Sequence, residues 1–157
     1  MKKLILSLSI LVLFVSGVSA GEKKAVQPTP KDKCAVCGMF VAKFPDFLAQ
    51  IIYKDGSYVA FDGPKDLFKY HLDIKKYTPA KKASDIDSIY VMDYYTLTPI
   101  DGLTAYYVIG SDVFGPMGKE LIPFTKESDA KEFMKDHQGK SLLRFAEITA
   151  ATLKEMN

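Results

Sequence analysis

The chain has 157 residues, and its 21 lysines and arginines stand against 19 aspartates and glutamates, for a formal net charge of +2 at pH 7. Two of the basic residues lie in an N-terminal segment that we expect to be removed, which leaves 19 charges of each sign. Such a balance excludes the basic surface that nucleic-acid binding requires. Two cysteines are also too few for a fold built on disulfides.

The first twenty residues have the order of a secretory signal peptide. Lys2 and Lys3 precede an apolar run over residues 4–18, and Ala20 is a suitable cleavage position. The run is shorter than the roughly 20 residues that span a bilayer, so a permanent anchor is less favoured than cleavage. No cysteine follows the run to accept a lipid. We therefore predict a cleaved signal peptide over 1–20, a periplasmic protein, and no transmembrane segment or lipid anchor in the mature chain.

Residues 21–33 are rich in lysine, proline and threonine and show no apolar periodicity. Pro28 and Pro30 disfavour regular structure there, so a flexible leader is expected. About 137 residues follow the signal peptide, a length that fits one compact domain. We place that domain at residues 34–157.

A hairpin and a helix open the domain. Apolar runs over 47–53 and 58–61 flank Lys54-Asp55-Gly56-Ser57, which is strong turn chemistry and predicts a β-hairpin. Asp62 is a suitable N-cap and Pro64 suits the first turn of the helix that should follow.

The same order recurs later in the chain. Strands are expected over 89–95 and 105–109, and the second of these should form a hairpin with 120–124. Thr125 should cap a helix that Gly139 ends, before a short strand over 142–145 and a helix over 148–156. The predicted fold class is α+β, with two ββα-like units and helices packed on antiparallel sheets.

The chemistry concentrates in residues 34–39, Cys-Ala-Val-Cys-Gly-Met, where Cys34 and Cys37 can contact one soft metal ion. Structural zinc is poorly supported because no second cysteine pair or paired histidines accompany them. Covalent haem attachment would need a histidine where Gly38 stands. A redox pair usually opens a helix, whereas the residues after Cys37 favour a turn and an extended segment, which weakens redox catalysis without excluding it.

Two methionines point towards copper. Met39 lies beside the thiols, and a thioether is a good ligand for Cu(I) and a poor one for zinc. Met117 lies in the turn Gly115-Pro116-Met117-Gly118, where it is either a second thioether ligand or a side chain that fills a gap. His71 and His137 lie at helix ends, where capping is the simpler interpretation.

Three segments, in order, resemble the NosL family of copper-binding accessory proteins. They are residues 34–43 with the Cys-Gly-Met triplet, Phe61-Asp62-Gly63 before a helix, and residues 115–118 leading to 121–124. The resemblance implies a periplasmic, non-enzymatic Cu(I) chaperone that takes copper from a membrane donor and loads nitrous-oxide reductase. It also implies that Cys37 and Met117 are copper ligands and that Asp62 is a supporting group.

The sequence departs from the family at two points. Its relatives are commonly lipoproteins, and many have only the cysteine of the Cys-Gly-Met triplet, so Cys34 is either a further ligand, a redox gate or neither. The predicted metal ligands are thus Cys37, Met117, Met39 and Cys34, with Cu(I) as the ion. The alternatives are a thiol-disulfide oxidoreductase using Cys34 and Cys37, and a heavy-metal scavenger or sensor.

Overall fold

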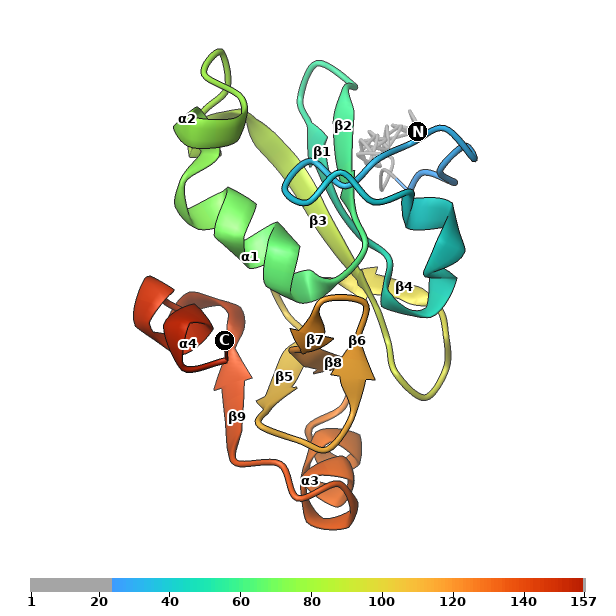
Figure 1. Cartoon of the computed structure of the whole chain (residues 1–157), viewed down its shortest axis with the longest axis vertical. Helices are drawn as coiled ribbons and strands as arrows, with labels where there is room; N and C mark the ends of the chain where they lie inside the picture. Colours follow the sequence, from blue (N-terminus) through green and yellow to red (C-terminus); the bar gives the residue numbers. More distant parts are fainter. Residues whose placement is uncertain (1–23, 157) are drawn as a thin grey trace, which may run out of the picture.

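The first half of the molecule is built on a four-stranded sheet. A computed structural model describes residues 24–156, so the predicted signal peptide lies outside the described residues. Strands β1 (Ala49–Tyr53), β2 (Tyr58–Phe61), β3 (Ile86–Met92) and β4 (Pro99–Asp101) pair in the order β2-β1-β3-β4, and all neighbours are antiparallel (Figure 1). The first predicted hairpin is confirmed, with Gly56 in the left-handed region at φ +85° in its turn.

A smaller sheet forms the second half. Strands β5 (Tyr106–Ile109), β8 (Ile122–Phe124) and β9 (Ser141–Arg144) pair antiparallel in the order β8-β5-β9. The long connection between β5 and β8 contains a two-stranded hairpin of β6 (Phe114–Gly115) and β7 (Gly118–Lys119). Met117 lies in the turn of this hairpin.

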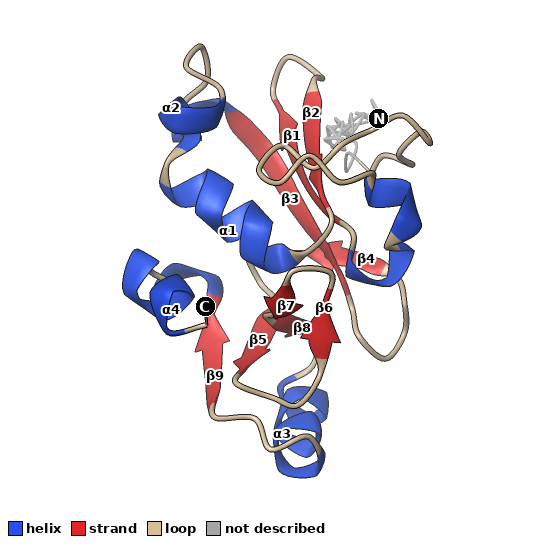
Figure 2. Ribbon diagram, in the orientation of Figure 1, coloured by secondary structure: helices blue, strands red, loops and turns tan. Residues whose placement is uncertain are grey.

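Four α-helices accompany the sheets in the described residues (Figure 2). Helix α1 (Pro64–Leu72) contacts β1 and β2, and α3 (Glu127–Asp136) contacts all three strands of the second sheet. Helix α4 (Ala150–Glu155) packs against α1, and the short helix α2 (Ile74–Tyr77) follows α1 in the chain. None of the helices in residues 24–156 is both long and apolar enough to span a membrane.

The predicted α+β class with two ββα-like units is confirmed, and the structure shows that the predicted strand after each helix joins the sheet of its unit. In both halves the order is strand, strand, helix, strand, and the first strand lies between the other two, as β2-β1-β3 and β8-β5-β9 show. The first strand of each half, β1 or β5, is central and so pairs on both of its edges. Its second partner is the strand that follows the helix, β3 in the first half and β9 in the second.

Both predicted N-caps are wrong by one residue. Helix α1 is preceded by Gly63, which has no side chain to cap it, and α3 by Lys126, whose side chain forms no capping hydrogen bond. Thr125 instead donates its backbone N–H and its hydroxyl to Asp93, at 2.7 and 2.8 Å. Asp62 faces a cysteine thiol rather than the helix backbone. In each case a tertiary partner replaces the local hydrogen bond that the sequence favours.

Other boundaries also differ from the prediction. Phe47 ends a 3₁₀ turn rather than starting β1, β3 begins at Ile86, and β4 and α2 were not predicted. Residues 24–33 form no helix or strand, but Val26 exchanges two backbone hydrogen bonds with the Gln50 side chain. This part of the expected leader therefore contacts the domain.

One hydrophobic core joins the two halves. It contains the apolar side of α1 and the inner residues of β1 and β3, and it continues into the second half through Tyr107, Leu121 and Leu153. Met156, which the sequence places near a fraying end, is buried in this core with 4% of its surface exposed. A second, smaller core lies between α3 and the second sheet. The halves thus share packing, which fixes the loops of one against the loops of the other.

Candidate metal site

The two cysteines lie in a tight loop that is closed by its own backbone. The Cys34 N–H donates to the Met39 carbonyl at 2.7 Å, and the Gly38 N–H donates to the Cys34 carbonyl at 3.0 Å. Gly38 has φ +80°, a conformation that costs a residue with a Cβ atom more than it costs glycine. No helix begins in this loop, so neither cysteine opens a helix as redox cysteines usually do.

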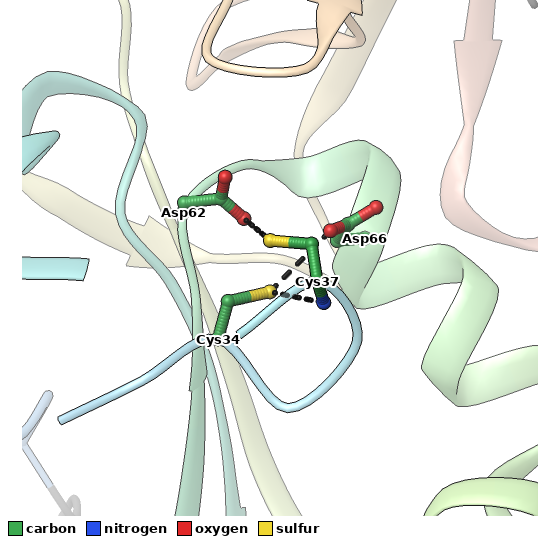
Figure 3. A group of neighbouring side chains, drawn as sticks. All are labelled: Cys34, Cys37, Asp62 and Asp66. Atoms are coloured by element: carbon green, nitrogen blue, oxygen red, sulfur yellow. Dashed lines mark hydrogen bonds between the residues drawn. The ribbon is translucent and has the colours of Figure 1, made fainter. Parts of the chain in front are cut away.

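Two aspartates from the start of α1 complete a four-residue cluster with the thiols (Figure 3). The Cys37 thiol donates to Asp62 Oδ1 at 3.3 Å, and the Cys34 thiol donates to Asp66 Oδ2 at 3.4 Å. The ligand atoms of all four residues lie within 4.8 Å of one another. This spacing is compact enough for one ion to contact several of them.

The cluster is buried except on one side. Cys34, Asp62 and Asp66 expose 3% of their surface or less, whereas Cys37 is only partly buried. Burial raises the pKa of both thiols, and the neighbouring backbone N–H of Met39 opposes that rise at Cys37. Both thiols therefore keep their protons at neutral pH, and a metal ion must displace a proton to bind a thiolate.

The carboxylates are held by the first turn of α1. Asp62 precedes the helix by two residues and Asp66 lies in its first turn, where the helix dipole favours negative charge. Asp66 also forms an ion pair with Lys69, at 2.9 Å between Nζ and Oδ1. The Oδ2 atom of Asp62 is buried and has no hydrogen-bond partner among the described residues. A buried acceptor of this kind favours an incoming proton or cation.

The turn that carries Met117 is fixed to the same end of α1. The Lys65 ammonium group donates to the Met117 carbonyl at 2.6 Å, and Lys65 lies between the two cluster aspartates in sequence. Figure 1 shows the β6–β7 hairpin beside the start of α1. Met117 itself is 41% exposed. It is therefore not a core methionine that fills a gap.

A second contact, made by Glu120, holds the hairpin in place. Its Oε1 accepts the backbone N–H of Lys65 at 2.5 Å and that of Leu121 at 2.9 Å. A Cβ atom at Gly63 would lie 2.3 Å from Glu120 Oε2, and one at Gly115 would lie 3.0 Å from it. The carboxyl group is thus enclosed between the start of α1 and the β6–β7 hairpin, and both glycines are needed to admit it.

The structure therefore groups the predicted ligands at one end of α1. Cys34 and Cys37 are adjacent, Met39 lies in their loop with its side chain partly buried, and the Met117 turn is bound to Lys65. The ligand roles of all four remain predictions. Sequence reasoning missed Asp66, although its spacing of four residues from Asp62 would place both carboxylates on one side of a helix start.

The two histidines lie elsewhere. His137 pairs with Asp112 at 2.9 Å and stacks on Phe133 at the end of α3, within the second half. His71 packs edge-on against Phe145, and burial lowers its pKa. Neither belongs to the thiol–carboxylate cluster.

Fold and site together define a class: small α+β domains in which a thiol–carboxylate cluster and an exposed methionine turn share one helix start. The NosL family model matches residues 25–153, and the chain belongs to the NosL family. The copper-binding lipoprotein NosL of Stutzerimonas stutzeri is 32% identical over 162 aligned residues, which cover 93% of this chain and 81% of that one.

Solved structures also match. The crystal structure of the copper chaperone NosL from Shewanella denitrificans superposes with a TM-score of 0.69 at 29% identity, and the match covers 83% of this chain and 99% of that one. The solution structure of apo-NosL from Achromobacter cycloclastes matches 67% of this chain and 87% of that one, with a TM-score of 0.47 at 29% identity.

The buried Glu120 predicts a pH dependence of folding stability. Burial raises its pKa from 4.5 to about 8, so between these values the unfolded chain loses the proton that the folded chain keeps. Stability should therefore fall as pH rises from about 5 to 8, by on the order of 4 kcal/mol from this group, because each pH unit between the two pKa values changes the free energy of unfolding by about 1.4 kcal/mol. Glu120→Gln should remove that part of the dependence. Urea unfolding of both proteins across this range measures it, and parallel stability profiles would contradict the assignment.

Proposed function

We propose that this protein is a periplasmic, non-enzymatic metallochaperone that carries Cu(I) at Cys37. The observation that carries the proposal is a partly exposed Cys37 thiol beside a buried second thiol, at the helix end to which the Met117 turn is bound. The names of its relatives support copper as the ion, since one is called copper-binding and another a copper chaperone.

The donor set suits a monovalent soft ion. Cys37 supplies a thiolate and Met117 a thioether, and Met39 or Cys34 completes or adjusts the site. When Cu(I) replaces the Cys37 thiol proton, the neighbouring Asp62 is placed to accept that proton, because its Oδ1 already accepts the thiol hydrogen bond at 3.3 Å. Cu(I) then adds one positive charge to the cluster, and the proton transferred from the thiol neutralises the negative charge of Asp62.

Exposure of Cys37 suits release as well as binding. Cu(I) tolerates two or three ligands, so an incoming donor atom can attach on the open side before Cys37 leaves. Cys34, with 3% of its surface exposed, cannot take part in such an exchange at the surface. By family membership, the acceptor we propose is apo nitrous-oxide reductase and the donor a membrane copper transporter. The expectation of no lipid anchor is opposed by the name of the Stutzerimonas stutzeri relative, which is called a lipoprotein.

A thiol-disulfide oxidoreductase is the main rival, and the thiol environment weighs against it. A redox-active cysteine needs a lowered pKa, whereas burial raises the pKa of both thiols here. A scavenger would retain the ion against an acceptor, which is harder to reconcile with the exposed Cys37 thiol.

Replacing the proposed ligands should weaken copper binding selectively. We expect Cys37→Ser to lower the Cu(I) affinity by about 100-fold or more and Met117→Leu by about tenfold, since each removes one soft donor. Competition with a chromophoric Cu(I) chelator measures both. Met134→Leu, on α3 in the second core, is the matched control and should bind copper as the parent does. Parent-like affinity in both ligand variants would overturn the assignment.

Cys34 separates the carrier from the oxidoreductase. In the carrier, Cys34→Ser should lower the Cu(I) affinity by no more than about tenfold and leave transfer to an acceptor intact, because Cys37 remains. In an oxidoreductase, the same change removes the resolving thiol and abolishes disulfide exchange. Measuring copper transfer and insulin reduction on the same variant gives opposite results for the two functions. If the metal-free parent has disulfide reductase activity and Cys34→Ser abolishes that activity, the oxidoreductase is favoured.

A further inference from the structure

A groove lies between α1, α2 and α4, next to the metal cluster but separate from it. Its volume is about 510 Å³, which is within the range of pockets that hold small ligands or side chains of a partner. Its apolar lining comes from Leu72, Tyr77 and Leu153. Leu72 is 44% exposed, so the last turn of α1 presents an apolar side chain that the described residues leave open.

Positive charge surrounds this apolar lining. Lys69, Lys76 and Lys154 line the groove from three different helices, and Asp73 is the single acidic residue among its lining groups. The 21 basic and 19 acidic residues of the chain nearly balance, so three lysines beside one aspartate form a local positive field. Lys76 and Lys154 contribute most to this field because Lys69 is paired with Asp66. Lys76 also lies over the Tyr77 ring, with its ammonium nitrogen 5.2 Å from the ring centroid.

Lys69 connects the groove to the proposed copper site. Its Nζ donates to Asp66 Oδ1 at 2.9 Å, and the other oxygen of Asp66 accepts the Cys34 thiol at 3.4 Å. One residue therefore lines the groove and contacts the cluster. Lys69 lies three residues after Asp66, which is roughly 5 Å along the helix axis.

We propose that this groove is a docking surface for the protein that exchanges copper with this NosL-family chain. An acidic segment of that partner binds in the groove, and one of its apolar side chains enters the hollow. Glutamates or aspartates beside that side chain pair with Lys69, Lys76 and Lys154. The inference rests on the proposed function for the partner's role, but the groove itself binds without metal. Electrostatic attraction then accelerates the encounter and places the partner's ligands near Cys37.

A peptide fits this surface better than a membrane does. Of the apolar lining, Leu153 is buried and Tyr77 is half-buried, whereas Lys76 and Lys154 are exposed, which suits a side chain that enters between the lysines from a narrow segment. A flat lipid surface would need the apolar groups to project beyond the charges. Binding to a vesicle is therefore a separate outcome that the experiment must recognise.

The test uses a capped peptide in which two leucines are flanked by glutamates, titrated into the metal-free, isotope-labelled protein. Amide chemical shifts should change at residues 69–77 and 150–154, saturate, and weaken as salt is added. An otherwise identical peptide with glutamines should bind at least threefold more weakly. Lys76→Gln with Lys154→Gln should weaken the glutamate peptide about threefold to tenfold. Both lysines are exposed and lie outside the thiol–carboxylate cluster, so Cu(I) affinity should not change.

A matched double variant gives the control. Lys126→Gln with Lys135→Gln removes the same charge from exposed positions at α3 and should leave peptide binding unchanged. The proposal is overturned if this control weakens binding equally, if the shifts do not map to the groove, or if only phosphatidylglycerol vesicles bind there. Peptide binding without Cu(I) binding would refute the proposed function and leave the groove in place. Cu(I) binding without peptide binding would refute the docking proposal and leave the proposed function in place.

Discussion

A carboxyl group with no access to solvent, that of Glu120, is the constraint on which the arrangement of this molecule depends. It accepts backbone hydrogen bonds from Lys65 at the start of α1 and from Leu121, and it occupies the space that Gly63 and Gly115 leave. Burying such a group is costly unless its hydrogen bonds are made, so the β6–β7 hairpin must lie in one position relative to the start of α1. The Met117 turn is thereby held at the start of α1, the helix whose first turn carries Asp66.

The cluster at that helix start combines properties that a carrier of Cu(I) needs. Burial keeps the thiols protonated and so protects them while no ion is bound, and two carboxylates beside them can accept the protons that metal binding displaces. One of the two thiols stays accessible, so binding can be reversed by another ligand. The same helix carries Lys69 and Leu72, which line the groove, and Lys69 also pairs with Asp66 of the cluster.

The sequence predicted the helices and strands better than the helix caps and the contacts between the two halves. Alternating apolar residues and Asp55-Gly56 specified the first hairpin, and the family motif located the cysteines and Met117. The roles of Asp62 and Thr125 were misjudged because local capping is visible in a sequence, whereas a tertiary partner is not. Glu120 was missed for the same reason, whereas Asp66 was visible in its four-residue spacing from Asp62 and was overlooked. A single charged residue near an apolar strand looks solvated until the opposite half of the molecule is known to bury it.

The central claim is that the soft metal is held between the cysteine loop and the Met117 turn, two segments far apart in the sequence. X-ray absorption at the copper K-edge of the Cu(I)-loaded protein tests it most directly, because it counts the sulfur atoms bound to the ion. The account predicts at least two sulfur donors in the parent and one fewer in Met117→Leu. An identical sulfur count in the two proteins would show that the ion is bound by the cysteine loop alone and would contradict the account.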